Sequence, residues 1–185
     1  DKNCHAATPA PAGPNRRPGL RGVLASASPT PGATLGPEPN QGNTHMLSDL
    51  ADYESSVYSQ CGEDGVLQRI FEVIDTRSRH FVEFGAWDGQ HLSNTANLRL
   101  HGGWQGLLME GSDKADGELV KREFVDAGNV NALFEKHGVP ASFDLLSIDI
   151  DGNDYWVWKA IEDYTPRVVV VEYNVFFPID QACTI

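Results

Sequence analysis

Long apolar runs and paired cysteines are both missing from this chain of 185 residues. No apolar stretch approaches the length of about 18 residues that a membrane-spanning helix needs, so no membrane span is expected. The three cysteines, Cys4, Cys61 and Cys183, lie far apart and include no Cys-x-x-Cys pair. This spacing argues against a zinc knuckle or a disulfide scaffold and favours a reducing compartment such as the cytoplasm.

Positive charge is also scarce. Residues 45–185 contain ten Lys and Arg against twenty-four Asp and Glu. A surface this acidic repels phosphate backbones, so nucleic acid is not an expected partner.

The first 44 residues differ in composition from the rest. They hold eight of the eleven prolines and few large apolar side chains, so they cannot bury enough surface to offset the entropy of ordering. They contain no initiator Met and no continuous apolar core, so they are not a complete secretory signal. We predict a disordered leader over 1–44 and one folded domain over 45–185.

Apolar periodicity in that domain predicts strands that alternate with helices. The first expected strand begins the segment 80–89, and the others occupy 104–111, 122–126, 143–150 and 166–174. The first expected helix begins at residue 63, and the others occupy 92–101, 112–124, 128–140 and 154–164. Because the strand cores are apolar on both faces, the predicted fold is α/β, a Rossmann-like, doubly wound, mainly parallel sheet with helices on both faces. Five strands are fewer than such sheets usually have, so we expect truncation at the C-terminus.

Carboxylates follow four of the five expected strands. They are Glu83 with Asp88, Glu110, Asp149 with Asp151, and Glu172. Ligands of open α/β sheets bind beyond the carboxyl ends of the strands, so these acids predict a binding site at that edge.

The loop after the first strand narrows the ligand class. Gly85 and Gly89 let the backbone approach a ligand, but the loop is not Gly-x-Gly-x-x-Gly and lacks the Lys-Ser/Thr pair of a phosphate-binding loop. Glu110, at the end of the next strand, can accept both hydroxyls of a ribose. Glu83 and Asp88 add negative potential that suits a cationic sulfonium. The pattern therefore favours S-adenosylmethionine over a dinucleotide.

Four segments in this order resemble the FkbM-like branch of the class I S-adenosylmethionine-dependent methyltransferases. They are FVEFGAWDG (81–89), GLLMEGS (106–112), DLLSIDIDGNDYW (144–156) and VVVVEYN (168–174). The resemblance implies an enzyme that methylates a hydroxyl of a sugar or small molecule. Ser147 departs from the pattern, since many relatives have Lys there.

The resemblance also assigns residues to parts of the cofactor. It implies that Glu83, Gly85 and Gly89 line the methionine part, that Glu110 binds the ribose with Ser112 beside it, that Asn129 or Asn131 lies near the adenine, and that Asp149 faces the methyl group and the acceptor.

A hydroxyl acceptor needs a base within hydrogen-bond reach. Asp149 is the first candidate and His91 the second. Asp151 and Asp154 are expected as much to cap the helix at 154–164 as to act on the substrate. Trp156 and Trp158 are expected to pack in the core.

Two other functions stay open. Asp149 and Asp151 form an Asp-x-Asp pair that fits a metal-dependent glycosyltransferase. A degenerate methyltransferase fold without catalytic activity, serving as a binding module, is the other alternative. A phosphatase that uses Asp149 as its nucleophile lacks the required downstream residues. An EF-hand is excluded because Asp154 and Ala160 occupy the positions of its Gly and Glu.

Overall fold

The computed structural model describes residues 49–172. The predicted leader over 1–44 lies outside the described residues, as do residues 173–185. Within them, no helix is both long enough and apolar enough to cross a membrane.

Five strands form one sheet in which every neighbouring pair is parallel. The order across the sheet is β3-β2-β1-β4-β5. The strands are β1 (His80–Phe84), β2 (Gln105–Glu110), β3 (Val120–Arg122), β4 (Ser142–Ile148) and β5 (Thr165–Val171). This order and the parallel pairing confirm the predicted Rossmann-like α/β fold.

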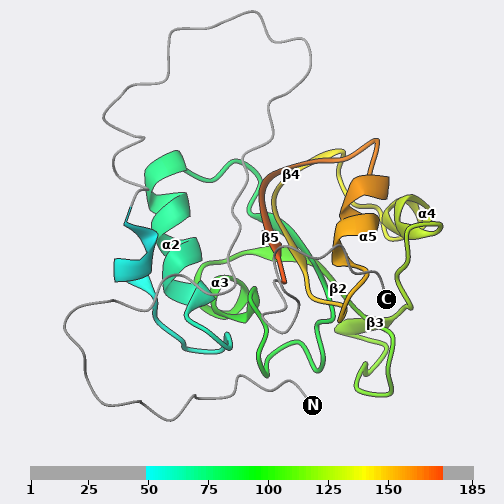
Figure 1. The fold of residues 1–185 in the computed structure, drawn as a ribbon, viewed down its shortest axis with the longest axis horizontal. Helices are drawn as coiled ribbons and strands as arrows, with labels where there is room; N and C mark the ends of the chain where they lie inside the picture. Colours follow the sequence, from blue (N-terminus) through cyan, green and yellow to red (C-terminus); the bar gives the residue numbers. More distant parts are fainter. Residues whose placement is uncertain (1–48, 173–185) are drawn as a thin grey trace, which may run out of the picture.

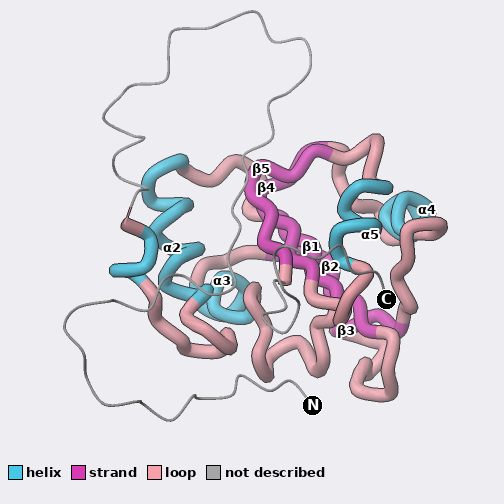
Figure 2. Tube along the Cα trace, viewed as in Figure 1, coloured by secondary structure: helices cyan, strands magenta, loops and turns pink. Residues whose placement is uncertain are grey.

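Helices cover both faces of the sheet (Figures 1 and 2). The first element of the described residues is a short 3-10 helix, η1 (Leu50–Tyr53). The α-helices of residues 49–172 are α2 (Glu63–Ile74), α3 (Ala96–His101), α4 (Val130–Lys136) and α5 (Asp154–Ala160). Side chains of α2 and α3 pack in a core on one face, and those of α4 and α5 pack in a second core on the other. Alternate residues of β1, β2, β4 and β5 supply the two cores, which is why these strands are apolar on both faces.

The central strand β1 pairs with β2 on one side and with β4 on the other. Phe84 of β1 is in register with Met109 of β2 and with Ile148 of β4, which is itself in register with Val171 of β5. The strand ends are therefore level at one edge. The chain reverses its direction of travel across the sheet between β1 and β4, which makes this the switch point where α/β sheets bind ligands.

One predicted helix is wrong and one predicted strand is displaced. Residues 112–124 form turns and the strand β3, which begins before the expected 122–126. The Oδ1 atom of Asp116 accepts the amides of Glu118 and Val120, and Gly117 has a φ of +81°. This side-chain-to-backbone bonding competes with helix formation, and it fixes a turn within the range predicted as a helix.

A buried ion pair holds the other end of the sheet. The Asp144 side chain is fully buried, and its Oδ2 atom accepts the backbone amides of residues 77, 78 and 79. Its Oδ1 atom lies 2.8 Å from Nη1 of Arg167. Arg167 also donates to the carbonyls of Ile74 and Asp75 at the end of α2. This cluster joins α2, the start of β1, β4 and β5.

Candidate functional site

A cavity of about 450 Å³ opens at the carboxyl edge of the sheet. Its lining comes from the segments that follow four neighbouring strands. These residues are Gly85 and Trp87 after β1, Met109–Ser112 at the end of β2, 123–126 after β3, and Asp149, Ile150, Asp151 and Asn153 after β4. The cavity therefore lies where the acids at the strand ends predict a site.

Glu110 lies at the centre of the lining, and two loops are anchored to it. Its Oε2 atom accepts the backbone amide of Trp87 at 3.1 Å, and its Oε1 atom accepts that of Ser112 at 2.8 Å. Each carboxylate oxygen has a further lone pair, so the side chain can still accept hydrogen bonds from a ligand. The predicted residues Glu110 and Ser112 thus both lie at the cavity.

Gly85 allows β1 and β4 to approach closely at the cavity. Its φ is +69°, and a Cβ atom placed there would lie 1.7 Å from the carbonyl oxygen of Asp149. The missing side chain thus makes room for protein backbone, whereas the sequence suggested room for a ligand.

Replacing Gly85 with Ala is expected to destabilise the fold by about 1–3 kcal/mol more than replacing Gly138 with Ala. Gly138 has nearly the same φ, +67°, but a Cβ there would meet nothing within 4 Å. Both variants carry the strain of a left-handed Ala, and only Gly85→Ala adds the overlap with Asp149. Urea unfolding of the two proteins measures the difference, and equal losses of stability would contradict the close approach.

Asp154 fastens the loop that carries the acids after β4. Its Oδ1 atom accepts the amide of Ile150 and its Oδ2 atom accepts that of Gly152, both at 2.9 Å. Asp151, between them, has a φ of +58°. The predicted helix cap at Asp154 therefore bonds the loop that precedes α5, and it holds Asp149 and Asp151 at the cavity.

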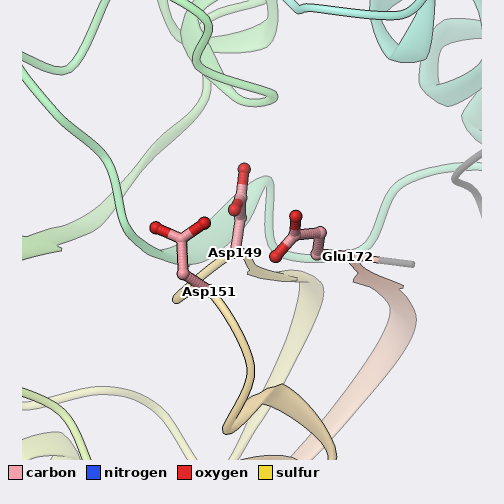
Figure 3. A group of neighbouring side chains, drawn as sticks. All are labelled: Asp149, Asp151 and Glu172. Atoms are coloured by element: carbon pink, nitrogen blue, oxygen red, sulfur yellow. The ribbon is translucent and has the colours of Figure 1, made fainter. Parts of the chain in front are cut away.

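Three carboxylates meet beside the cavity. One oxygen from each of Asp149, Asp151 and Glu172 lies within 4.8 Å of the other two (Figure 3). They come from the ends of β4 and β5, and their oxygens are the ligand type that Mg²⁺ and Mn²⁺ prefer. For a methyltransferase the sequence predicts no metal ligand, whereas the glycosyltransferase alternative uses Asp149 and Asp151 of these three acids.

Glu83 does not line the cavity. It is buried on the α3 side of the sheet, where its carboxylate accepts the hydroxyls of Ser93 and Thr95 and the amide of Asn94. Asn94 also donates to the hydroxyl of Ser147. Glu83 thus fixes the segment before α3.

Gly89 and Asn131 also lie outside the lining. A Cβ at Gly89 would be about 3 Å from side chains of β2 and β3, so this glycine serves packing. The Asn131 side chain donates to the carbonyl of Ala160 and accepts the amide of Glu162, so it joins α4 to the end of α5. Asn129, the other expected adenine neighbour, donates to the carbonyl of Phe124.

No family model, no curated protein and no solved structure matches this chain.

The four lining residues after β3 are not among the site residues predicted from the sequence, because the end of that strand is predicted too late in the chain. Phe124 is 75% exposed within the cavity lining, and Asp126 and Glu123 lie beside it. Lys136 and, secondarily, His137 donate to the Glu123 carboxylate and lower its pKa. The first two strands each have an acid near their carboxyl end, and the same pattern applied to the third strand would have indicated Glu123.

The second candidate base lies away from the cavity lining. The backbone amides of His91 and Gln90 donate to Oδ1 of Asp88, and the His91 amide is the main cause of the lowered pKa of Asp88. His91 and Asp88 thus close the turn after β1.

The two tryptophans of α5 differ in environment. Trp158 packs against the core as expected, whereas Trp156 is 45% exposed. The prediction of a core position for Trp156 is wrong, because α5 turns its Asp154 and Val157 side to the sheet.

Proposed function

We propose that the protein is an S-adenosylmethionine-dependent methyltransferase of the FkbM-like type that methylates a hydroxyl of a sugar or small molecule. The observation that carries the proposal is the position of Glu110. It ends β2 inside the cavity, and no Lys, Arg or His is among the described lining residues. Such a lining suits a ligand with hydroxyl donors and a positive charge, and it disfavours phosphates.

The parts of the cofactor fit the lining residues in order. Glu110 offers free lone pairs to the two ribose hydroxyls. The exposed ring of Phe124, on the neighbouring strand end, offers a flat apolar surface to the base. Asp149 and Asp151, on the other side of β1, suit the positively charged part.

When bound, the cofactor supplies an electrophilic methyl group. Asp149 is the residue for the acceptor, since its carboxylate follows β4 at the switch point and can take the proton of a hydroxyl at an Oδ atom. Asp154 keeps the loop after β4 in place, so Asp149 is held before a ligand arrives.

The carboxylate triad favours one second candidate function. Asp149, Asp151 and Glu172 can surround a divalent cation, as a glycosyltransferase that binds a nucleotide sugar through a metal requires. The diphosphate of such a ligand would meet an acidic lining that has no Lys, Arg or His among its described residues. The glycosyltransferase function would show itself as binding of a UDP-sugar that depends on Mn²⁺.

Calorimetry with S-adenosylhomocysteine tests the methyltransferase proposal directly. We expect a dissociation constant in the micromolar range without added metal. No binding of this compound, together with Mn²⁺-dependent binding of a UDP-sugar, would replace the proposal with the glycosyltransferase. Cofactor binding without transfer to any sugar or small-molecule hydroxyl would indicate a non-catalytic binding module.

A further inference from the structure

Two aromatic side chains lie exposed on the outer surface of α5. Tyr155 is 56% exposed and Trp156 is 45% exposed, and their ring centres lie 5.1 Å apart in an edge-to-face arrangement. The ammonium group of Lys159 lies 5.4 Å from the centre of the Trp156 ring and 5.8 Å from that of the Tyr155 ring. Residues three and four positions apart are neighbours on a helix, so these three side chains form one surface, which we call the aromatic platform.

The aromatic platform adjoins the cavity. Asp151 and Asn153 line the cavity and are exposed, and Asn153 stands two residues before Tyr155. The platform therefore begins within roughly one helical turn of the cavity wall. Its three side chains are not among the lining residues, so a group that rests on the platform lies outside the cavity. Asn153 occupies the N-cap position of α5 without a capping hydrogen bond from its side chain, which leaves this amide for a ligand.

The area of the platform suits a small ligand and not a protein. Among residues 49–172, the other exposed large hydrophobic side chains lie outside α5; they are Tyr53, Val57, Leu100, Leu119 and Phe124. A fully buried aromatic side chain contributes about 150–250 Å², so two rings that are about half exposed offer roughly 150–250 Å² together. A stable protein partner buries about 800 Å² on each side of an interface. The platform therefore matches a ligand of the size of a sugar ring.

Flat apolar rings beside hydrogen-bonding groups suit a carbohydrate. A sugar ring has an apolar face of C–H groups and a rim of hydroxyl groups. The rings of Tyr155 and Trp156 can pack against the apolar face. The Asn153 amide, the Asp151 carboxylate and the Lys159 ammonium group surround these rings in the sequence, and together they donate to and accept from hydroxyl groups. A wholly apolar ligand would cover these polar groups without giving them hydrogen bonds.

We propose that the acceptor is a carbohydrate of at least two linked sugar units, of which one rests on the aromatic platform while its neighbour presents a hydroxyl to Asp149. The inference rests on the proposed function, in which Asp149 takes the proton of the acceptor. Two units are needed because Asp149 lines the cavity, whereas the platform lies outside the lining. The unit on the platform adds affinity, and it fixes which hydroxyl of its neighbour reaches Asp149.

A glycan array tests the inference when it is probed with the full chain in the presence of S-adenosylhomocysteine. We expect at least one oligosaccharide to bind, and calorimetry should show the monosaccharide of the same sugar binding at least about tenfold more weakly. If S-adenosylhomocysteine binds and no glycan does, or if the monosaccharide binds as tightly as the oligosaccharide, the inference is overturned and the proposed function stands. Binding of neither S-adenosylhomocysteine nor a glycan would overturn both.

A matched pair of variants places the second sugar unit. Trp156→Ala should weaken oligosaccharide binding about tenfold and leave the binding of the monosaccharide and of S-adenosylhomocysteine unchanged, whereas Trp156→Phe keeps a ring and should retain most of the affinity. Tyr53→Ala is the control, because this ring on η1 is 42% exposed and lies 4.8 Å from the Arg69 guanidinium, away from the cavity lining. It should bind the oligosaccharide like wild type. Equal losses in Trp156→Ala and Tyr53→Ala, or equal losses for the two sugars in Trp156→Ala, would overturn the platform.

Discussion

Replacing Asp144 with Ala is expected to lower the free energy of unfolding by about 3–5 kcal/mol. The change removes a fully buried carboxylate and leaves the Arg167 guanidinium and three backbone amides without their shared partner. Urea-induced unfolding followed by circular dichroism measures the loss. The exposed Asp163→Ala is the control, and we expect it to change stability by less than about 0.5 kcal/mol.

The same residue makes stability depend on pH. Burial raises the pKa of Asp144, but the Arg167 side chain and the amides of residues 77–79 outweigh it and hold the pKa below its usual value. The stabilisation from the ionised carboxylate is thus complete above the unfolded-state pKa of about 4, and it is lost as the pH falls through the lower folded-state value. Wild type should converge in stability with Asp144→Ala in acid. A difference that stays constant down to about pH 2 would contradict the ion pair.

Replacing Glu110 with Ala is expected to weaken S-adenosylhomocysteine binding by at least about 100-fold, which corresponds to about 2.7 kcal/mol. Each ribose hydroxyl that loses a charged acceptor costs about 1.5–3 kcal/mol. The variant also frees the amides of Trp87 and Ser112, which loosens two segments of the cavity wall. Calorimetry gives the affinity, and circular dichroism checks that the sheet is intact.

Two further variants distinguish the loss of the Glu110 carboxylate from a general effect of replacing a glutamate. Glu110→Gln keeps one acceptor oxygen, so its affinity should lie between those of wild type and Glu110→Ala. Glu118→Ala removes the same side chain from an exposed turn outside the lining and should bind like wild type. Wild-type affinity in Glu110→Ala would remove the main support for an adenosyl ligand.

The sheet could be predicted because its strands carry their signal locally. A run such as Leu145–Ile148 is apolar on both faces, and only a covered parallel sheet buries both. The three residues of β3 carry no such signal. Their start depends on the turn around Asp116 and Gly117, where hydrogen bonds from two backbone amides to the Asp116 carboxylate outweigh the helical preference of the residues nearby.

The site was predicted less completely than the fold. Acids at strand ends correctly indicated Glu110 and Asp149 at the cavity, because the carboxyl ends of parallel strands share an edge. The direction of a side chain at that edge does not follow from its position alone. Glu83 points to the α3 side and bonds Ser93 and Thr95, and this depends on where a segment ten residues later folds back.

The hydrogen bonds of Arg167 affect the order in which parts of the domain can fold during synthesis. It donates to the carbonyl of Ile74, which precedes it by 93 residues. At about 5–20 residues per second, a ribosome takes about 5–20 s to add that length. The carbonyl of Ile74, at the end of α2, therefore lacks the Arg167 donor until most of the domain has been synthesised. Nascent chains that stop short of Arg167 should be cut by proteases at the junction of α2 and β1, and longer chains should resist.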